Sequence, residues 1–206
     1  MSWFMASIYD WFMRDLEEAC GRAWRAELLS SLSGDTLEIG AGTGRNLEHY
    51  PRSGSGRLVL AEPDRHMQKK LEGRVAEVGG ERKIEIVPWE AEHLDAPDAT
   101  FDAVVSTLVL CSVGDVAKSL SEVRRVLRPE GKLLFFEHVA ADDPARLAWQ
   151  RRLQPLWRPI AGNCHLCRDT AHAIEDAGFR IEHIVRESAR KALPIVRPTI
   201  RGYALR

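Results

Sequence analysis

Short apolar segments typical of buried strands alternate with longer segments of helical periodicity along most of this chain. Strands are expected at residues 35–39, 57–61, 83–87, 101–106, 132–139, 179–186 and 200–205. Such alternation requires parallel strands joined by helical crossovers, because two parallel strands cannot be joined by a tight turn. The sequence therefore predicts an α/β fold, a doubly wound sheet with helices on both faces.

Segments with helical spacing fill the connections between the strands. Residues 64–78 repeat apolar side chains every three or four positions, and Asp115 is placed to cap a helix that includes Leu127 and ends before Pro129. Further helices are expected around 147–157, where three prolines should break the helix, and at 169–177.

The first thirty residues also have helical spacing, and they are rich in aromatic side chains. We expect residues 1–32 to form a helical lid beside a domain formed by residues 33–206, with residues 3–16 covering the ligand pocket. The aromatic residues of this segment are Trp3, Phe4, Tyr9, Trp11, Phe12 and Trp24.

Composition excludes several classes of partner. With 29 basic and 30 acidic side chains in 206 residues, the chain suits one globular domain without a basic stripe, so no nucleic-acid partner is expected. No apolar run reaches the length of a membrane span and no signal peptide is recognisable, so we expect no transmembrane segment. The four cysteines fall mainly at predicted core or helix positions, which disfavours disulfides and indicates a reducing, cytoplasmic location.

The first strand ends in a loop with three alternating glycines, Gly40, Gly42 and Gly44. Glycines let the chain turn sharply and let a ligand approach the backbone closely. The loop departs from the dinucleotide fingerprint, because its third glycine comes one position early and Arg45 follows it. Glu38, two residues before the loop, would repel a pyrophosphate. S-adenosylmethionine carries an ammonium and a sulfonium but no phosphate, and it suits this loop better.

Acidic residues follow the next two strands. Glu62 ends the second strand 22 residues after Gly40, where an acid can accept hydrogen bonds from both hydroxyls of a ribose. The turn formed by Glu90, Ala91 and Glu92 follows the third strand and can meet an adenine edge. The alternatives are a helix-capping role for Glu62 and a solvated acidic turn at 90–92.

Taken together, these segments resemble the class I S-adenosylmethionine-dependent methyltransferases. The resemblance implies a Rossmann-like sheet of seven strands with the last one antiparallel, and S-adenosylmethionine as the cofactor. The matching segments are LEIGAGTGRN (37–46), Glu62-Pro63-Asp64 with Met67, WEAEHL (89–94), Phe101-Asp102 and VRRVLRPEGKLLFFEHV (123–139).

The resemblance also implies roles for single residues. The glycine loop would frame the methionine part of the cofactor, Glu62 would hold the ribose, and the turn at 90–92 would line the adenine edge. Thr107 and Leu108 would lie under the cofactor at the end of the fourth strand. The full set of implied cofactor-binding residues is Glu38, Gly40, Ala41, Gly42, Gly44, Asn46, Glu62, Pro63, Met67, Glu90, Ala91, Glu92, Thr107 and Leu108.

A narrower resemblance extends to the end of the chain. It is similar to the methyltransferase-like 7 family of thiol S-methyltransferases, which implies a small, fairly apolar acceptor such as a thiol. Animal members carry a hydrophobic N-terminal anchor, and this chain starts instead with a short aromatic segment, so membrane attachment is not carried over. The segments concerned are STLVLCSV (106–113), EHVAA (137–141), CHLCR (164–168) and VRPTIRGYALR (196–206).

Three alternatives stay open at this point. Relatives with the same core methylate oxygen, nitrogen or carbon, for example on a secondary metabolite or a quinone-like ring. An oxidoreductase that uses a nicotinamide dinucleotide is disfavoured by the loop. A module that binds S-adenosylmethionine without catalysis would have no acceptor pocket.

The candidate catalytic residue is His138, at the end of the fifth strand, with His165 as the second choice. A general base is less necessary for a thiol than for a phenol, because part of the thiol is already ionised at neutral pH. His138 can equally be a hydrogen-bonded structural residue. Four tryptophans are candidates either for the wall of an apolar acceptor pocket or for packing: Trp3, Trp11, Trp149 and Trp157.

The segment from Cys164 to Cys167 has the spacing of half a metal site. Zinc usually takes four ligands from two such clusters, and the sequence has no second one. We therefore expect no metal. The sequence carries no signal for an oligomeric state.

Overall fold

The computed structural model describes residues 14–51, 56–78 and 82–206. Trp3, Trp11 and most of residues 3–16, the stretch expected to cover the pocket, lie outside the described residues. Helix begins within the described part at residue 14, passes through a π-helical turn, η1 (Glu17–Gly21), and continues as α2 (Arg22–Leu29).

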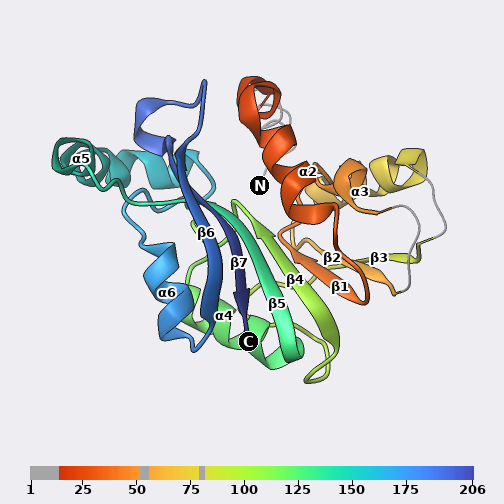
Figure 1. The fold of residues 1–206 in the computed structure, drawn as a ribbon. Coiled ribbons are helices and arrows are strands. Elements are labelled where there is room, and N and C mark those ends of the chain that lie inside the picture. Colours follow the sequence, from red (N-terminus) through yellow and green to blue (C-terminus); the bar gives the residue numbers. More distant parts are fainter. Residues whose placement is uncertain (1–13, 52–55, 79–81) are drawn as a thin grey trace.

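The described strands form one sheet of seven, in the order β3-β2-β1-β4-β5-β7-β6 (Figure 1). Strands β1 to β5 pair in parallel, whereas β7 is antiparallel to both β5 and β6. This confirms the predicted doubly wound sheet with an antiparallel last strand. The strands are β1 (Thr36–Ile39), β2 (Leu58–Ala61), β3 (Ile84–Val87), β4 (Phe101–Thr107), β5 (Leu127–His138), β6 (Arg180–Ser188) and β7 (Pro198–Leu205).

Helices cover both faces of the sheet. Leu37 and Ile39 of β1 lie in a core shared with α4 and α6, whereas Leu58 and Leu60 of β2 lie in a core shared with α2 and α3. The sheet is therefore buried from both sides, as expected for its continuous apolar strands. The remaining helices and short 3-10 turns are α3 (Arg65–Val78), α4 (Val116–Val126), α5 (Pro144–Ile160), α6 (Thr170–Asp176), η2 (Leu47–His49) and η3 (Pro194–Val196).

Helix α4 ends one residue earlier than predicted. Leu127 leaves the helix with extended dihedral angles and pairs with Phe101 of β4, so it already belongs to β5. Pro129 lies two residues after Leu127. It disfavours helical geometry at Arg128, so the helix ends before that residue. The expected cap is present, with the Asp115 carboxylate accepting from the backbone N–H of Lys118 at 3.0 Å.

Helix α5 is continuous, so the predicted break at its prolines is wrong. Pro144 occupies the first turn, where no backbone N–H is required, and the Asp143 side chain caps that turn by accepting from Arg146 N at 2.7 Å. Pro155 and Pro159 lie inside the helix. Each removes one helical hydrogen bond, and the remaining bonds maintain the helix.

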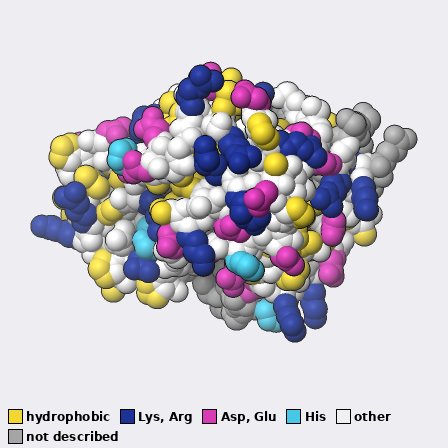
Figure 2. Space-filling view, turned by 90° about the horizontal axis from the view of Figure 1, so that it is seen from below, with side chains coloured by type: hydrophobic (Ala, Val, Ile, Leu, Met, Phe, Trp, Pro, Cys, Tyr) yellow, Lys and Arg dark blue, Asp and Glu magenta, His cyan; other side chains and the backbone are white. Residues whose placement is uncertain are grey.

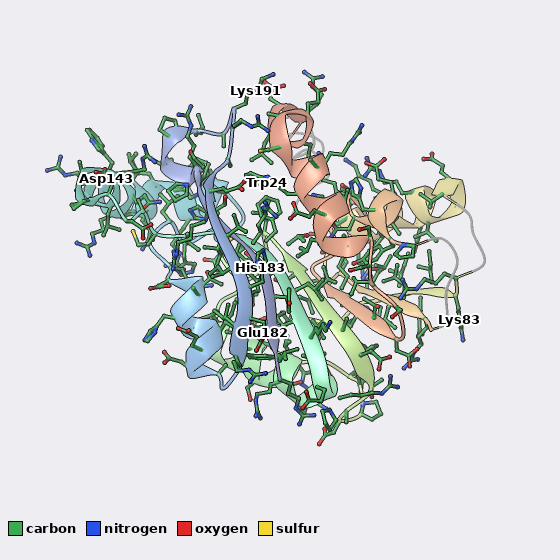
Figure 3. The ribbon with its side chains drawn as sticks, in the orientation of Figure 1. Trp24, Lys83, Asp143, Glu182, His183 and Lys191 are labelled. Atoms are coloured by element: carbon green, nitrogen blue, oxygen red, sulfur yellow. The ribbon has the colours of Figure 1, made fainter. Side chains whose placement is uncertain are left out.

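Helix α2 is part of the packed body of the protein. Trp24 points from α2 toward the sheet (Figure 3), and its ring meets that of Phe136 edge-on at 5.3 Å. The guanidinium of Arg201 lies 5.7 Å from the centre of the Trp24 ring. The segment expected to act as a lid therefore shares a core with β5 and β7 in its described part.

Charges of both signs are interspersed on the face seen from below (Figure 2), in line with the balanced composition. Within the described ranges, no helix combines the length and the hydropathy needed to cross a bilayer.

Candidate active site

The glycine loop takes the backbone geometry that the sequence suggested. Gly40 and Gly42 both have φ of +58°, a region that side chains disfavour. A Cβ on Gly40 would lie 2.5 Å from a methyl carbon of Val109, whereas a Cβ on Gly42 would meet no atom of the described residues closer than 3.9 Å. The loop therefore packs tightly on one side and leaves open space beside Gly42. The short turn η2 follows the loop, in place of the helix that a dinucleotide fold has there.

Glu62 is brought directly to this loop. Its carboxylate is 7% exposed and accepts from the backbone N–H groups of Gly42 at 2.8 Å and Asp64 at 2.9 Å. Burial raises its pKa above the ordinary value, while these two hydrogen bonds act in the opposite direction. Each carboxylate oxygen can accept a second hydrogen bond. The predicted pairing of loop and acid is thus present, with capacity left for two ribose hydroxyls.

Glu38 lies beneath the loop, in a buried polar network. It is 2% exposed and accepts from Asn46 Nδ2 at 2.9 Å and from the Tyr50 hydroxyl at 2.8 Å. Burial raises the pKa of Glu38 to about 7, although the two hydrogen bonds lower it. Glu38 and Asn46 therefore support the loop from below, in addition to any contact with a ligand.

Arg25 of α2 completes this network. Its Nη1 donates to Asn46 Oδ1 at 2.6 Å and to Thr107 Oγ1 at 3.0 Å. Its other donors reach the Glu17 carboxylate, with Nη2 to Oε1 at 3.0 Å. Arg25, Glu17 and Tyr50 were not among the residues expected from the sequence. A basic residue directly after Trp24 on a helical segment was the one available signal, and it does not reveal a partner 21 residues away.

The end of β4 carries a strained residue. Leu108 has φ of +60°, which costs of order 1 kcal/mol for a side chain of its kind. The next residue, Val109, packs against Gly40. The Glu137 carboxylate accepts hydrogen bonds from the N–H groups of residues 109–111, and these bonds hold the backbone in this conformation.

The residues expected near the adenine differ in their burial. Met67 is 5% exposed and Ala91 is 7% exposed, whereas Pro63 and Glu90 lie on the surface. The Glu92 carboxylate accepts from the backbone N–H of Gly114 at 2.8 Å, which ties the turn after β3 to the start of α4. This hydrogen bond gives Glu92 a structural role in addition to the expected contact with adenine.

Beyond the cofactor loop, His138 lies next to two cysteines. Its Nδ1 is 3.3 Å from the sulfur of Cys164, and His138 is 3% exposed. The sulfur of Cys111 belongs to the same cluster, in which all ligand atoms lie within 4.8 Å of one another. A hydrogen bond between the thiols, together with burial, raises the pKa of Cys111, and the same hydrogen bond lowers the pKa of Cys164.

The other candidates for the acceptor pocket are two tryptophans and His165, and they differ in burial and position. Trp157 is half-buried and close to Cys164. Trp149 is 57% exposed and lines a shallow apolar hollow with Leu193. It occupies the outer face of α5, beside the Arg152 guanidinium. His165 contributes its backbone N–H to the carbonyl of Cys111 at 2.8 Å.

The residues around the loop fit a ligand that is free of phosphate. Two buried carboxylates, Glu38 and Glu62, lie against the glycine loop. In their ionised forms these carboxylates would repel a pyrophosphate, and an ammonium or a sulfonium bound nearby would favour the ionised forms. Space beside Gly42 and spare acceptor capacity on Glu62 suit a nucleoside with free ribose hydroxyls.

Comparison with known proteins agrees with this geometry. Residues 37–135 match the family model described as a methyltransferase domain. Thiol S-methyltransferase TMT1B of Rattus norvegicus is 40% identical over 148 residues, which are 69% of this chain and 59% of the relative. Its counterpart in Homo sapiens is 38% identical over 195 residues, covering 88% of this chain and 78% of the relative.

This chain belongs to the TMT1 family of thiol S-methyltransferases. It spans 59% of the length of the rat TMT1 protein. A solved structure titled as an S-adenosylmethionine-dependent methyltransferase from Mesorhizobium loti shares the fold, with a TM-score of 0.66 at 21% identity over 90% of this chain and 96% of that one. Membership of the TMT1 family identifies S-adenosylmethionine as the cofactor, in agreement with the charge and shape of the loop.

Proposed function

We propose that this protein transfers the methyl group of S-adenosylmethionine to small, fairly apolar thiols. The observation that carries the proposal is the similarity to human TMT1B over 195 residues, which extends well beyond the cofactor-binding segment. The glycine loop with Glu62, at the carboxyl ends of β1 and β2, supports the cofactor half of the proposal.

The residues of the chain bind and orient the reactants. The backbone at Gly40, Ala41, Gly42 and Gly44 accommodates the methionine part, and Glu62 holds the ribose. When bound, S-adenosylmethionine supplies an electrophilic methyl group on a sulfonium. The main task left to the protein is to hold the acceptor about 3 Å from that carbon and to exclude water.

We place the acceptor on the side of His138. Its Nε2 is buried and has no hydrogen-bond partner in the described part of the chain, so it is available to an acceptor. A thiol with pKa of about 8.5 is roughly 3% ionised at pH 7, against about 0.1% for a phenol. The thiol therefore needs less help from a base, which suits a site with one histidine.

An acceptor panel tests the proposal. Purified protein is incubated with S-adenosylmethionine and a small alkyl thiol, a phenol or an amine of similar size, and both S-adenosylhomocysteine and the methylated product are quantified. We expect kcat/KM for the thiol to exceed that for the phenol by at least about tenfold at pH 7, in line with the difference in ionised fraction. The Glu62→Ala variant is the matched control for cofactor-dependent turnover.

Each other result supports a rival function. Turnover of the phenol or the amine without the thiol supports an O- or N-methyltransferase, and transfer to an activated ring carbon supports a C-methyltransferase. Tight binding of S-adenosylmethionine with no turnover of any acceptor supports a binding module. We also propose a cytoplasmic location, supported by the four cysteines, all of which are unpaired.

A further inference from the structure

Three side chains that bind soft metals meet at the acceptor side of the sheet. Cys111 follows β4, His138 ends β5, and Cys164 lies in the loop after α5. Their ligand atoms all lie within 4.8 Å of one another, and Nδ1 of His138 is 3.3 Å from the Cys164 sulfur. No two of the three are close in sequence, so spacing alone could not reveal the cluster.

We propose that Cys111, His138 and Cys164 bind a zinc ion and leave its fourth position open for the acceptor thiolate. Zinc–sulfur distances of about 2.3 Å and zinc–nitrogen distances of about 2.0–2.1 Å place tetrahedral S and N ligands roughly 3.6 Å apart, and two S ligands roughly 3.8 Å apart. The 3.3 Å between Nδ1 of His138 and the Cys164 sulfur is close to the first of these values, and no pair of ligand atoms in the cluster is more than 4.8 Å apart. Small side-chain movements are enough to enclose the ion.

The charge that the cluster would carry once it is ionised matches that of a divalent cation. Cys111 and His138 are 2% and 3% exposed, and Cys164 is half-buried beside them. Two thiolates and a neutral imidazole carry two negative charges, which one zinc ion neutralises. A buried set of this kind is stable when it coordinates a metal, whereas isolated buried thiolates are costly.

The surrounding backbone holds the ligands in place. The N–H of Cys111 donates to the Glu137 carboxylate at 3.1 Å, and its carbonyl accepts from His165 N at 2.8 Å. The N–H of Cys164 donates to the carbonyl of Ala161 at 3.1 Å. Metal sites depend on such supporting contacts, which fix the orientation of each ligand before the ion arrives.

Three protein ligands and an open position form the pattern of a catalytic rather than a structural zinc site. A thiol would bind there as its thiolate and release its proton to water. A bond then forms between the thiolate sulfur and the methyl carbon, while the carbon–sulfonium bond breaks and its electron pair stays on the donor sulfur. The product thioether is neutral and a weak ligand, so it leaves. This step rests on the proposed thiol acceptor, and it makes His138 a metal ligand instead of a base.

Cys167 provides a matched control. It lies in the same segment as Cys164, yet it is outside the cluster, and its backbone N–H pairs with Gln154 Oε1 at 3.2 Å. The sequence presents Cys164 and Cys167 as a pair, for which we expected no metal. The proposal separates them, because it assigns a ligand role to Cys164 alone.

The test is a titration of chelator-treated, fully reduced protein with zinc alone. We expect one equivalent bound by the wild type and by Cys167→Ser, and affinity lowered at least about tenfold in Cys164→Ser. Cobalt titration provides a spectroscopic signature, because thiolate ligands give an intense near-ultraviolet absorption. Addition of a small alkyl thiol should then shift the visible bands of the cobalt protein, which reports the open position without any turnover.

The wild-type titration decides the proposal even if a variant fails to fold. Wild-type protein that binds less than about 0.1 equivalent of zinc at micromolar concentration overturns it, as does equal loss of zinc in Cys164→Ser and Cys167→Ser. Zinc binding without thiol methylation supports the site and contradicts the proposed function. Thiol methylation by metal-free protein supports the proposed function and contradicts the role given to the metal.

Discussion

Arg25 of α2 donates a hydrogen bond of 2.6 Å to Oδ1 of Asn46, which follows the glycine loop. The same guanidinium reaches Thr107 at the end of β4 and Glu17 in the preceding helical turn. One buried side chain thus links the N-terminal helical segment to two strand ends that build the cofactor site. The link predicts that α2 and the cofactor loop stabilise each other.

Removal of Arg25 should destabilise the protein strongly. The Arg25→Met variant leaves Glu17 as a buried charge without its partner, which typically costs about 3–5 kcal/mol in the free energy of unfolding. Urea denaturation measures the loss. Arg22→Ala is the matched control, since that side chain is 70% exposed and pairs with Glu48 on the surface, where the loss should be below about 1 kcal/mol.

A double variant identifies the cause. If the unpaired carboxylate of Glu17 is responsible, Arg25→Met combined with Glu17→Gln should recover part of the lost stability. Equal stability of Arg25→Met and the wild type would show that the buried network contributes nothing.

Cofactor affinity should depend on Glu62 and on the open space beside Gly42. Glu62→Ala should weaken binding of S-adenosylmethionine by about 1.5–3 kcal/mol, the value of hydrogen bonds to a charged group. Gly42→Val should weaken it further, because the side chain occupies the ligand space and the backbone has φ of +58°. Calorimetric titration measures both. Gly73→Ala in α3 is the control, since a Cβ there meets no atom of the described residues within 4 Å.

The order of the elements and the pairing of the glycine loop with Glu62 could be predicted, because both depend on local sequence. Strands, breakers and caps are readable over a few residues, and the acid follows the next strand along the sheet. The hydrogen bonds of Arg25 and the cluster of Cys111, His138 and Cys164 could not be predicted. Arg25 meets Thr107 across 82 positions, and Cys111 meets Cys164 across 53. Contacts of this kind arise only from tertiary packing.

Stability should depend on pH through Glu38. Burial raises its pKa from 4.5 to about 7, so the folded protein holds a proton that the unfolded chain releases within this interval. The free energy of unfolding therefore falls as the pH rises from 4.5 to 7, by up to about 3 kcal/mol from this group. Glu38→Gln removes the titration and should gain stability relative to the wild type as the pH increases.

The measurement is urea denaturation of both proteins at pH 5 and pH 7.5. The difference between wild type and variant isolates Glu38 from Glu62, whose pKa burial also raises. A difference that stays constant across this range would show that Glu38 is already ionised at the lower pH in the folded protein.

Glu137 should determine the geometry of the loop that carries Cys111. Its Oε1 accepts from Ser106 Oγ at 2.7 Å and from the backbone N–H groups of Val109 and Leu110, both at 3.1 Å, while Oε2 accepts from Cys111 N. Glu137→Gln keeps the shape but turns an amide N–H₂ toward one of these donors. A buried donor left without an acceptor costs about 1–3 kcal/mol, so the variant should lose that much stability.

The effect of Glu137→Gln on zinc affinity separates positioning from simple stability. Because the backbone N–H of Cys111 depends on Glu137, the variant should bind zinc about 10–100-fold more weakly while remaining folded. Ser106→Ala removes one donor to the same carboxylate without touching Cys111, so it should lose about 1 kcal/mol of stability and keep its zinc affinity. Equal weakening of zinc binding in both variants would mean that general loosening of the core, and not the orientation of Cys111, controls the site.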